Sequence, residues 1–461
     1  MNGQMLENPV ILPFCASGVV FVIVLIASLS NFVSPLLVLV PLALSVLLWA
    51  LIRNPLAMLG VVLAFMPFDF MAVALGKFLG LPHMTLVSVC TKEIPLLLVA
   101  ALLWGHYRFK ATVPDWFLLA CFLLALTRTV LGGTLGGFAL DLDFVIPYAV
   151  GRVTVLSLKQ ETIWARCAIW IAAVLSVAGM FEVFVLGETP RTLLYLAIDS
   201  ETEGGKLTSP FHAAGFTGLR ESATMVGPNG FAALCMIALV IWWVYSRNPA
   251  PAGMIAGGLI CTVTRSAWLG TAVAIPLIAV MMGQKKRLLS HAVGAFVLFL
   301  TAIPLLDLGD YLHYNRTRQE ISAEYHGNEI LEGLEYDVEH PFGSGNVTIS
   351  PTLSKENTDA IFFETTYPAF AAAYGIPAAL CLLGFLYTSL RLLWRSRTPL
   401  GCAAVGVLVG MCVVMTFTNS LIDRRLICWA WFPVGLAIRS SVSGAMPESK
   451  EQQEMRGAVG A

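Results

Sequence analysis

The residues best suited to chemistry lie in one long polar segment, residues 307–375, held between apolar stretches of the chain. In a sequence that is 57% hydrophobic and 12% charged, this segment carries twelve acidic and three basic residues, a local net charge of −9. We therefore expect an active-site loop on the outer side of a membrane. Its acidic residues are Asp307, Asp310, Glu320, Glu324, Glu329, Glu332, Glu335, Asp337, Glu339, Glu356, Asp359 and Glu364, and its basic residues are Arg316, Arg318 and Lys355.

Glu364 is the candidate general base of this segment. It lies four residues before Pro368, where an apolar stretch begins. A carboxylate at such a boundary is partly desolvated, which raises its pKa toward the range useful for proton abstraction. The alternative is a carboxylate that only complements the dipole of a helix starting there.

Four arginines are candidate anion-binding groups. Arg220 lies eight residues before Pro228-Asn229-Gly230, which is a typical helix start. The amide groups of such a start and the guanidinium of Arg220 could bind a phosphate together. The alternative is that Arg220 contacts lipid headgroups. Arg265 is flanked by apolar residues on both sides, and because a buried arginine costs about 2.5–3.5 kcal/mol on insertion scales, it calls for a partner or a ligand. Arg316 and Arg318 open the acidic loop, where they either meet a lipid-borne phosphate or form weak surface ion pairs.

Composition places these residues in an all-α polytopic integral membrane protein. The mean hydropathy is +0.78 over 461 residues, and apolar runs long enough to cross a bilayer recur along the chain. All ten cysteines lie in apolar segments, with neither a disulfide framework nor metal-ligand spacing. The sequence has no glycine-rich phosphate loop and no nucleophile turn, so we expect catalysis without a metal or a cofactor, and no nucleic-acid partner.

The short basic loops predict about twelve full spans with both termini cytoplasmic. Segment 253–282 has basic residues at both ends, so we expect two shorter helices that meet at a turn around Arg265. A further amphipathic helix is expected between Arg316 and Glu339, ending at His340-Pro341. The predicted spans are 9–30, 33–52, 55–75, 84–104, 113–131, 142–157, 165–186, 229–246, 289–306, 368–391, 400–419 and 425–439. The predicted domains are a transmembrane region 1–306 with an outer loop at 187–228, the large loop 307–367, the carboxyl-terminal spans 368–439 and a disordered cytoplasmic tail 440–461.

Five motifs around the large loop resemble those of the O-antigen ligase and O-antigen polymerase superfamily of bacterial envelope enzymes. They occur in the family's order over residues 210–380. They are Arg220 with Gly227-Pro228-Asn229-Gly230-Phe231-Ala232; Thr264-Arg265-Ser266-Ala267-Trp268-Leu269-Gly270; Arg316 or Arg318; His340-Pro341-Phe342-Gly343-Ser344-Gly345; and Glu364-Thr365-Thr366-Tyr367-Pro368 followed by Gly375-Ile376. Ligases carry histidine where this chain has Glu364, so the polymerase branch is the better match.

The resemblance implies a GT-C-like fold and an inverting glycosyltransferase of the bacterial inner membrane. It implies an undecaprenyl-diphosphate-linked glycan as donor and another as acceptor, with a flippase and a chain-length regulator as possible protein partners. The catalytic residues would be Glu364, Arg220 and Arg318. The substrate-binding residues would be Arg265, Arg316, Asn229, Tyr367 and His340.

Two alternatives remain from sequence. The first is a ligase that transfers the glycan to lipid A core. The second, from another class, is a secondary transporter, because broken helices and charges in apolar segments also suit transport. The charges in question are Lys92 and Glu93 inside an apolar run, and Asp69, Arg128, Arg152 and Glu182 at segment ends.

Overall fold

The computed structural model describes residues 54–78, 95–101, 103, 110–187, 223, 225, 227–305, 321–346, 363, 365–418 and 424–443. Of these residues 86% are helical and none lies in a strand. The chain divides into two compact units, residues 1–109 with 186–208, and residues 110–185 with 209–461. The predicted spans 9–30 and 33–52, most of 84–104, and the tail 440–461 lie wholly or largely outside the described residues.

In the first unit, the stretch predicted as a span at 55–75 forms a helix that is interrupted once. Helix α3 (Pro55–Phe65) starts after Asn54, whose side chain accepts a hydrogen bond from the amide of Ala57. A single 3-10 turn, η2 (Met66–Phe68), joins it to α4 (Asp69–Phe78). Pro67 lies in that turn, and because proline has no amide hydrogen it disrupts the regular helical ladder there.

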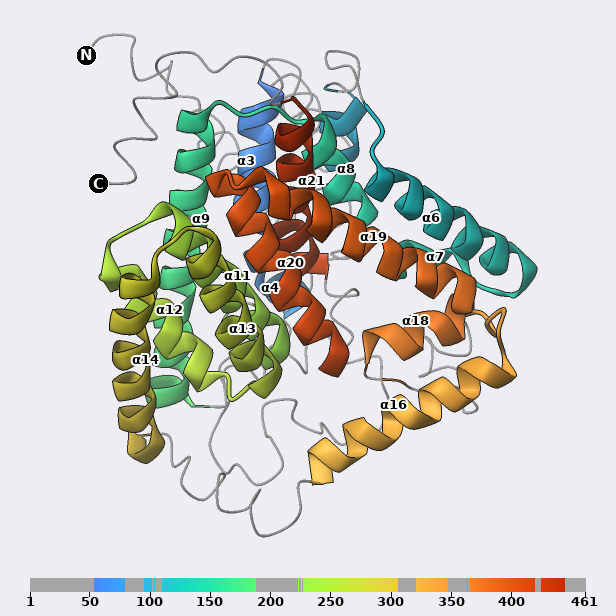
Figure 1. Cartoon of the computed structure of the whole chain (residues 1–461). Helices are drawn as coiled ribbons and strands as arrows, with labels where there is room; N and C mark the ends of the chain where they lie inside the picture. Colours follow the sequence, from blue (N-terminus) through green and yellow to red (C-terminus); the bar gives the residue numbers. More distant parts are fainter. Residues whose placement is uncertain are drawn as a thin grey trace, which may run out of the picture. The chain divides into compact units, whose positions relative to one another are not determined.

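The second unit is a helical bundle in which two of the candidate membrane helices are mostly buried (Figure 1). These are α11 (Pro228–Tyr245) and α20 (Pro399–Phe417), which pack against each other. The helices around them are α6 (Val113–Gly132), α7 (Leu135–Asp141), α8 (Val145–Val153), α9 (Leu158–Phe181) continued by the π-helical η3 (Glu182–Leu186), α12 (Pro249–Cys261), α13 (Arg265–Met281), α14 (Lys285–Leu305), α16 (Ile321–Glu339), α18 (Thr366–Tyr374), α19 (Ile376–Ser396) and α21 (Arg424–Ser443).

Five of the described helices are long and apolar enough to cross a membrane: α6, α9 with η3, α11, α19 and α20. Helices α11 and α20 are mostly buried, whereas only 22% of the apolar stretch of α6 and 33% of those of α9 and α19 are buried. Large apolar side chains such as Trp116, Trp170 and Leu380 are exposed on these outer helices. Such surfaces are costly in water and are what lipid-facing helices present.

The predicted break in segment 253–282 is confirmed, since α12 ends at Cys261 and α13 begins at Arg265. The predicted amphipathic helix is also present as α16, which ends at Glu339, just before His340-Pro341.

Two predicted spans differ from the structure. Segment 142–157 contains only the nine-residue α8, about 14 Å long at 1.5 Å per residue and too short to cross a bilayer. Segment 368–391 is broken at Gly375, which separates α18 from α19. The physical reason in the second case is the backbone of Gly375, whose φ of +92° lies outside the helical region.

Candidate functional site

Four predicted site residues, Glu364, Arg220, Arg316 and Arg318, lie outside the described residues. The other four, Arg265, Asn229, Tyr367 and His340, are described and belong to the second unit. The site is therefore built from the elements that hold these four and the residues on either side of Glu364.

Arg265 is the first residue of α13 and follows a tight turn. Val263 in this turn has a φ of +51°, which is rare and strained for a β-branched residue. Two hydrogen bonds brace the turn on the carbonyl oxygen of Leu259: the hydroxyl of Thr262 donates at 2.7 Å and the indole Nε1 of Trp268 at 2.9 Å. The side chain of Arg265 is half-buried at a helix start, where amide groups favour anions.

Asn229 lies beside this turn, at the start of α11. Its Oδ1 is 3.4 Å from the hydroxyl oxygen of Thr264, the residue just before Arg265. The amino-terminal ends of α11 and α13 are thus adjacent, and the structure brings Asn229 and Arg265 into one neighbourhood.

The close packing of α13 against α20 shows that α13 begins at the end of the bundle where α20 finishes. A Cβ atom on Gly270 would lie 3.1 Å from the carbonyl oxygen of Gly410, and one on Gly406 would lie 2.9 Å from the side chain of Ile278. Residue numbers rise along α13 as they fall along α20, so the two helices are antiparallel. Small residues at such contacts allow apolar helices to approach closely.

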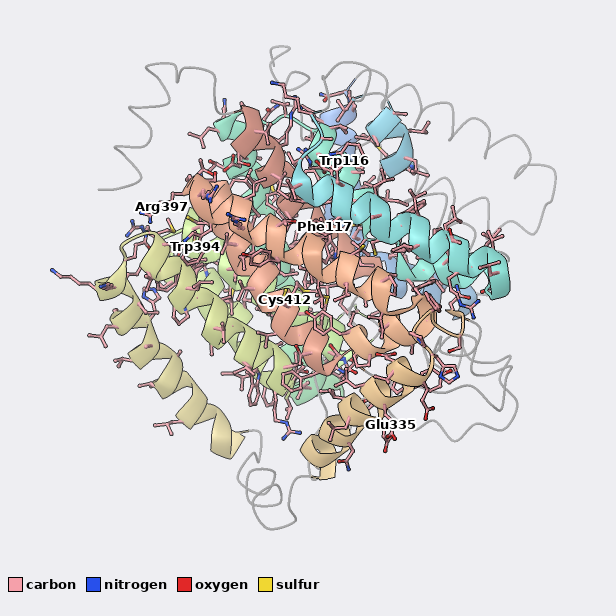
Figure 2. All side chains as sticks on the ribbon, turned by 45° about the vertical axis from the view of Figure 1, so that its right-hand side comes forward. Trp116, Phe117, Glu335, Trp394, Arg397 and Cys412 are labelled. Atoms are coloured by element: carbon pink, nitrogen blue, oxygen red, sulfur yellow. The ribbon has the colours of Figure 1, made fainter. Side chains whose placement is uncertain are left out.

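Helix α18 begins at this same end. The hydroxyl of Thr366 donates to the carbonyl oxygen of Thr418, the residue that caps α20, at 2.8 Å. Tyr367 donates from its phenol hydroxyl to the carbonyl oxygen of Cys412 at 3.2 Å, which ties α18 to α20. Cys412 is labelled on α20 in Figure 2. Three helices, α11, α13 and α18, therefore start around the end of α20.

Helix α16 fixes the residues on both sides of Glu364. It lies beneath α18 in Figure 1, and a Cβ atom on Gly333 would lie 2.6 Å from the Cβ of Pro368. The rings of Tyr336 and Phe363 meet edge to face at 6.1 Å between centroids. The carboxylate of Glu329, which is 5% exposed, accepts a hydrogen bond from the amide of Thr365 at 3.2 Å.

Glu329 is not distinguished from the other acidic residues by its sequence context. The available signal is its register: Glu329, Gly333 and Tyr336 recur at helical spacing on one face of α16, and that face is the one packed on α18. Thr365 is also buried, and among the described residues its hydroxyl has no hydrogen-bond partner.

The segment His340 to Gly345 docks as backbone on the last turn of α18. The amides of Ser344 and Gly345 donate to the carbonyl oxygens of Ala372 and Ala373, at 2.8 and 3.0 Å. These carbonyls belong to the last turn of a helix, where intrahelical partners are missing. The amide of Ile376, the first residue of α19, donates to the carbonyl oxygen of Pro341 at 2.9 Å.

The glycines of this motif are required by packing. Gly343 and Gly345 have φ of +72° and +94°, and a Cβ on Gly343 would lie 2.6 Å from the amide nitrogen of Gly375. Arg128 completes the docking, because its Nε donates to the carbonyl oxygen of Gly343 at 2.9 Å. His340 stays exposed, with its ring stacked on Tyr336 at 4.2 Å between centroids.

A buried polar network joins this segment to α6, α7 and α18. Asn346 is fully buried; its Oδ1 accepts from the amide of Thr134 at 2.7 Å and its Nδ2 donates to the carbonyl oxygen of Thr134 at 2.9 Å. Tyr374 donates to Asp141 at 2.6 Å, and its hydroxyl oxygen also accepts from Asn346. Burial raises the pKa of Asp141 to about 6, although the hydrogen bond from Tyr374 opposes this shift. The hydrogen-bonded partners Asn346–Thr134 and Tyr374–Asp141 are more than 200 residues apart in the chain, so local sequence patterns do not predict this network.

Asp337, also on α16, predicts a pH-dependent stability. It is 4% exposed, its Oδ1 has no hydrogen-bond partner among the described residues, and burial raises its pKa to about 7. Because an unfolded aspartate titrates near 4, the native state retains a proton that the unfolded state has lost, so this group lowers stability progressively from about pH 4 to pH 7. We expect Asp337→Asn to unfold at a higher temperature than the wild type at pH 8, with a smaller difference at pH 4.5.

Thermal unfolding of both proteins across this pH range in one detergent measures the effect. Glu335→Gln on the exposed face of α16 is the matched control. A constant gap between Asp337→Asn and the wild type at all pH values would contradict the assignment.

The described part of the site brings three helix starts and Arg265 to one end of α20, an arrangement that favours an anionic group. No protein-family model matches the chain, and no curated protein matches it.

Proposed function

We propose that this protein is a membrane-embedded inverting glycosyltransferase that polymerises undecaprenyl-diphosphate-linked oligosaccharide repeat units into an O-antigen or an exopolysaccharide. The proposal rests on motif order and on geometry, since no family match supports it. One observation carries most of its weight. The segment His340–Gly345, one motif of the resemblance, is joined by backbone hydrogen bonds and by close-packed glycines to residues Ala372–Ile376, which include the closing Gly375-Ile376 of another motif.

The chemistry requires positive groups at the leaving diphosphate and a base at the attacking hydroxyl. In the reaction, an acceptor hydroxyl oxygen bonds to the anomeric carbon of the donor sugar, and the bond between that carbon and the diphosphate oxygen breaks. The negative charge that develops on the diphosphate is stabilised by Arg220, Arg265 and Arg318 together with the helix starts. Glu364 takes the hydroxyl proton.

Asn229 and Arg265 support this assignment because they lie together at the ends of two helices. Tyr367 and Arg316 would bind substrate beside them, although the phenol hydroxyl of Tyr367 already contacts the backbone of α20. His340, exposed at the edge of the docked segment, is suited to a contact with a sugar. The whole chain would have about twelve spans and a GT-C-like arrangement in the bacterial inner membrane, with both termini cytoplasmic and the site on the outer face.

Glycan gel analysis of a strain deleted for the gene tests the proposal. The strain is complemented with the wild type, Glu364→Gln or Arg220→Ala, each shown to accumulate in the membrane. We expect the wild type to restore long chains and both variants to leave single repeat units. Glu364→Gln cannot accept the proton of the attacking hydroxyl, and Arg220→Ala no longer stabilises the negative charge on the leaving diphosphate. Arg391→Gln, a change of an exposed arginine on α19, is the control and should restore polymer fully.

Three other results of this experiment would contradict the proposed polymerase or its assigned site. Long chains that accumulate on the lipid carrier, with none on lipid A core, would identify a ligase. Full polymer from both variants would refute the assigned site, and normal polymer in the deletion strain would refute the proposed function.

A further inference from the structure

Helix α16 carries a row of exposed apolar side chains on the face turned away from α18. Leu331, Leu334 and Val338 are 65%, 53% and 74% exposed, and Phe342 in the following turn is 75% exposed. The spacing of three and four residues places the first three on one side of the helix. The opposite side carries Gly333, which is packed on Pro368. The helix thus has two contact faces, and α18 covers one.

The apolar row on α16 finishes near the carboxyl-terminal end of α6 and the amino-terminal end of α19, two candidate membrane helices. The carbonyl carbon of Phe342 lies 2.8 Å from the place that a Cβ on Gly375 would occupy, directly before α19 starts. A Cβ on Gly345 would overlap the carbonyl oxygen of Gly132, the last residue of α6. The carboxyl-terminal end of α16 therefore lies at the boundary between membrane helices and outer loops.

Exposed apolar side chains also lie on these two helices near the turns that approach α16. On α6, Val130 and Leu131 are 75% and 74% exposed in the last turn, and on α19, Leu380 is 60% exposed in the second turn. Both helices are long and apolar enough to cross a membrane. The backbone of Phe342 packs against Gly375 at the start of α19, so the row on α16 ends beside a candidate membrane helix with exposed apolar side chains of its own.

The charges on α16 indicate which side faces water. Glu332, Glu335 and Glu339 are exposed along one edge of the apolar row, and Glu335 points away from the helices of the bundle in Figure 2. Residues 321–346 contain no lysine or arginine. An amphipathic helix of this kind gains binding energy from its apolar side chains, without attraction to anionic headgroups.

We propose that α16 lies in the outer boundary between headgroups and acyl chains, with Leu331, Leu334, Val338 and Phe342 in contact with lipid and its glutamates in water. The occupant of the exposed face is the bilayer itself, and neutral lipids are favoured over anionic ones. This proposal does not depend on the proposed function, because it concerns a surface and no reaction.

Site-specific photocrosslinking in lipid nanodiscs tests it. A benzophenone-bearing phenylalanine analogue is placed singly at Val338, Phe342, Glu335 or Leu380 of the full chain, in nanodiscs of phosphatidylcholine. After irradiation, mass spectrometry measures the fraction of protein that carries a lipid adduct. We expect adducts at Val338 and Phe342 comparable to those at Leu380, the membrane-helix control, and several-fold above those at Glu335.

Two crosslinking results would contradict the proposed contact between α16 and lipid. Lipid adducts at Leu380 but none at Val338 and Phe342 would overturn the proposal, and so would adducts at these two positions with a second copy of the chain. Replacing half of the lipid by phosphatidylglycerol should lower the yield at Val338 and Phe342 and leave it unchanged at Leu380. A higher yield in anionic nanodiscs would overturn the preference for neutral lipids.

Discussion

Gly345→Ala is expected to destabilise the protein by about 2–5 kcal/mol, because two costs add at this position. The backbone of Gly345 has a φ of +94°, which an L side chain rarely adopts. The new Cβ would also overlap the carbonyl oxygen of Gly132, and a backbone atom cannot rotate away as the end of a side chain can. The segment would have to leave the end of α6, and the hydrogen bond from Arg128 to Gly343 would be lost with it. Thermal unfolding in one detergent measures this loss.

Substitutions at two other glycines distinguish the cost of backbone strain from the cost of steric overlap. Gly283 also has a positive φ, of +69°, but nothing lies within 4 Å of the position that a Cβ would take there, so Gly283→Ala should cost only the strain of about 1–2 kcal/mol. Gly136 in α7 has neither constraint, and Gly136→Ala should be neutral or slightly stabilising. Equal losses for Gly345→Ala and Gly283→Ala would show that the docking against α6 contributes nothing.

The breaks in helices that follow local rules could be predicted from the sequence. The turn before Arg265 is indicated by basic residues at both ends of segment 253–282, and the end of α16 by His340-Pro341. Both signals are local in the chain, since proline cannot continue a helix and charged loops remain outside the bilayer. The break at Gly375 also has a local signal, because Pro377 lies in the first turn of α19. The φ of +92° at Gly375 has a distant partner as well, since the backbone of Phe342 packs against this glycine.

The candidate site was predictable as a set of motifs but not as an arrangement. The resemblance predicts that His340 binds substrate, and in the structure the glycines and amides of its motif bind the end of α18. Glu329 and Asn346 escape sequence reasoning because their partners, Thr365 and Thr134, are 36 and 212 residues away. Composition marks the loop as polar, whereas tertiary contact decides which of its polar groups are buried.

These contacts also bear on how Glu364 would be held. Its neighbours Phe363 and Thr365 are both fixed by α16, through the ring of Tyr336 and the carboxylate of Glu329. A base must stay within hydrogen-bond reach of the proton that it takes. A helix that rests on lipid on one face and holds this segment on the other would keep Glu364, the proposed base, at the depth of the proposed lipid-linked substrate.

The charges that suggest a transporter are in part explained by fixed structural contacts. Arg128 binds the carbonyl oxygen of Gly343, and Arg152 forms a bidentate pair with Asp115, with Nε to Oδ1 at 2.9 Å and Nη2 to Oδ2 at 2.7 Å. Asp115 also accepts from Tyr148 and from the amide and hydroxyl of Thr112. A carboxylate with this many donors and a 1% exposed arginine has little freedom to move with a transported ion.

Arg152→Met is expected to destabilise the protein by about 3–5 kcal/mol, the usual effect of removing one partner of a buried ion pair. Asp115 would keep its charge near the start of α6 without the guanidinium that neutralises it. The pair also positions α8, since Arg152 holds the end of α8 against α6, and α8 packs so closely on α21 that a Cβ on Gly151 would overlap the carbonyl oxygen of Phe432. Unfolding of the purified variant in detergent measures the cost.

A double-mutant cycle identifies the source of that cost. Asp115→Asn combined with Arg152→Met removes both charges, so the double variant should be more stable than Arg152→Met alone. Arg391→Met, at an exposed arginine of α19, should change stability by less than about 0.5 kcal/mol. If Arg152→Met costs no more than Arg391→Met, the pair does not hold α8. If the double variant is the least stable of all, the hydrogen bonds of Asp115 matter more than its charge, and α8 is held chiefly by Tyr148 and the contact with α21.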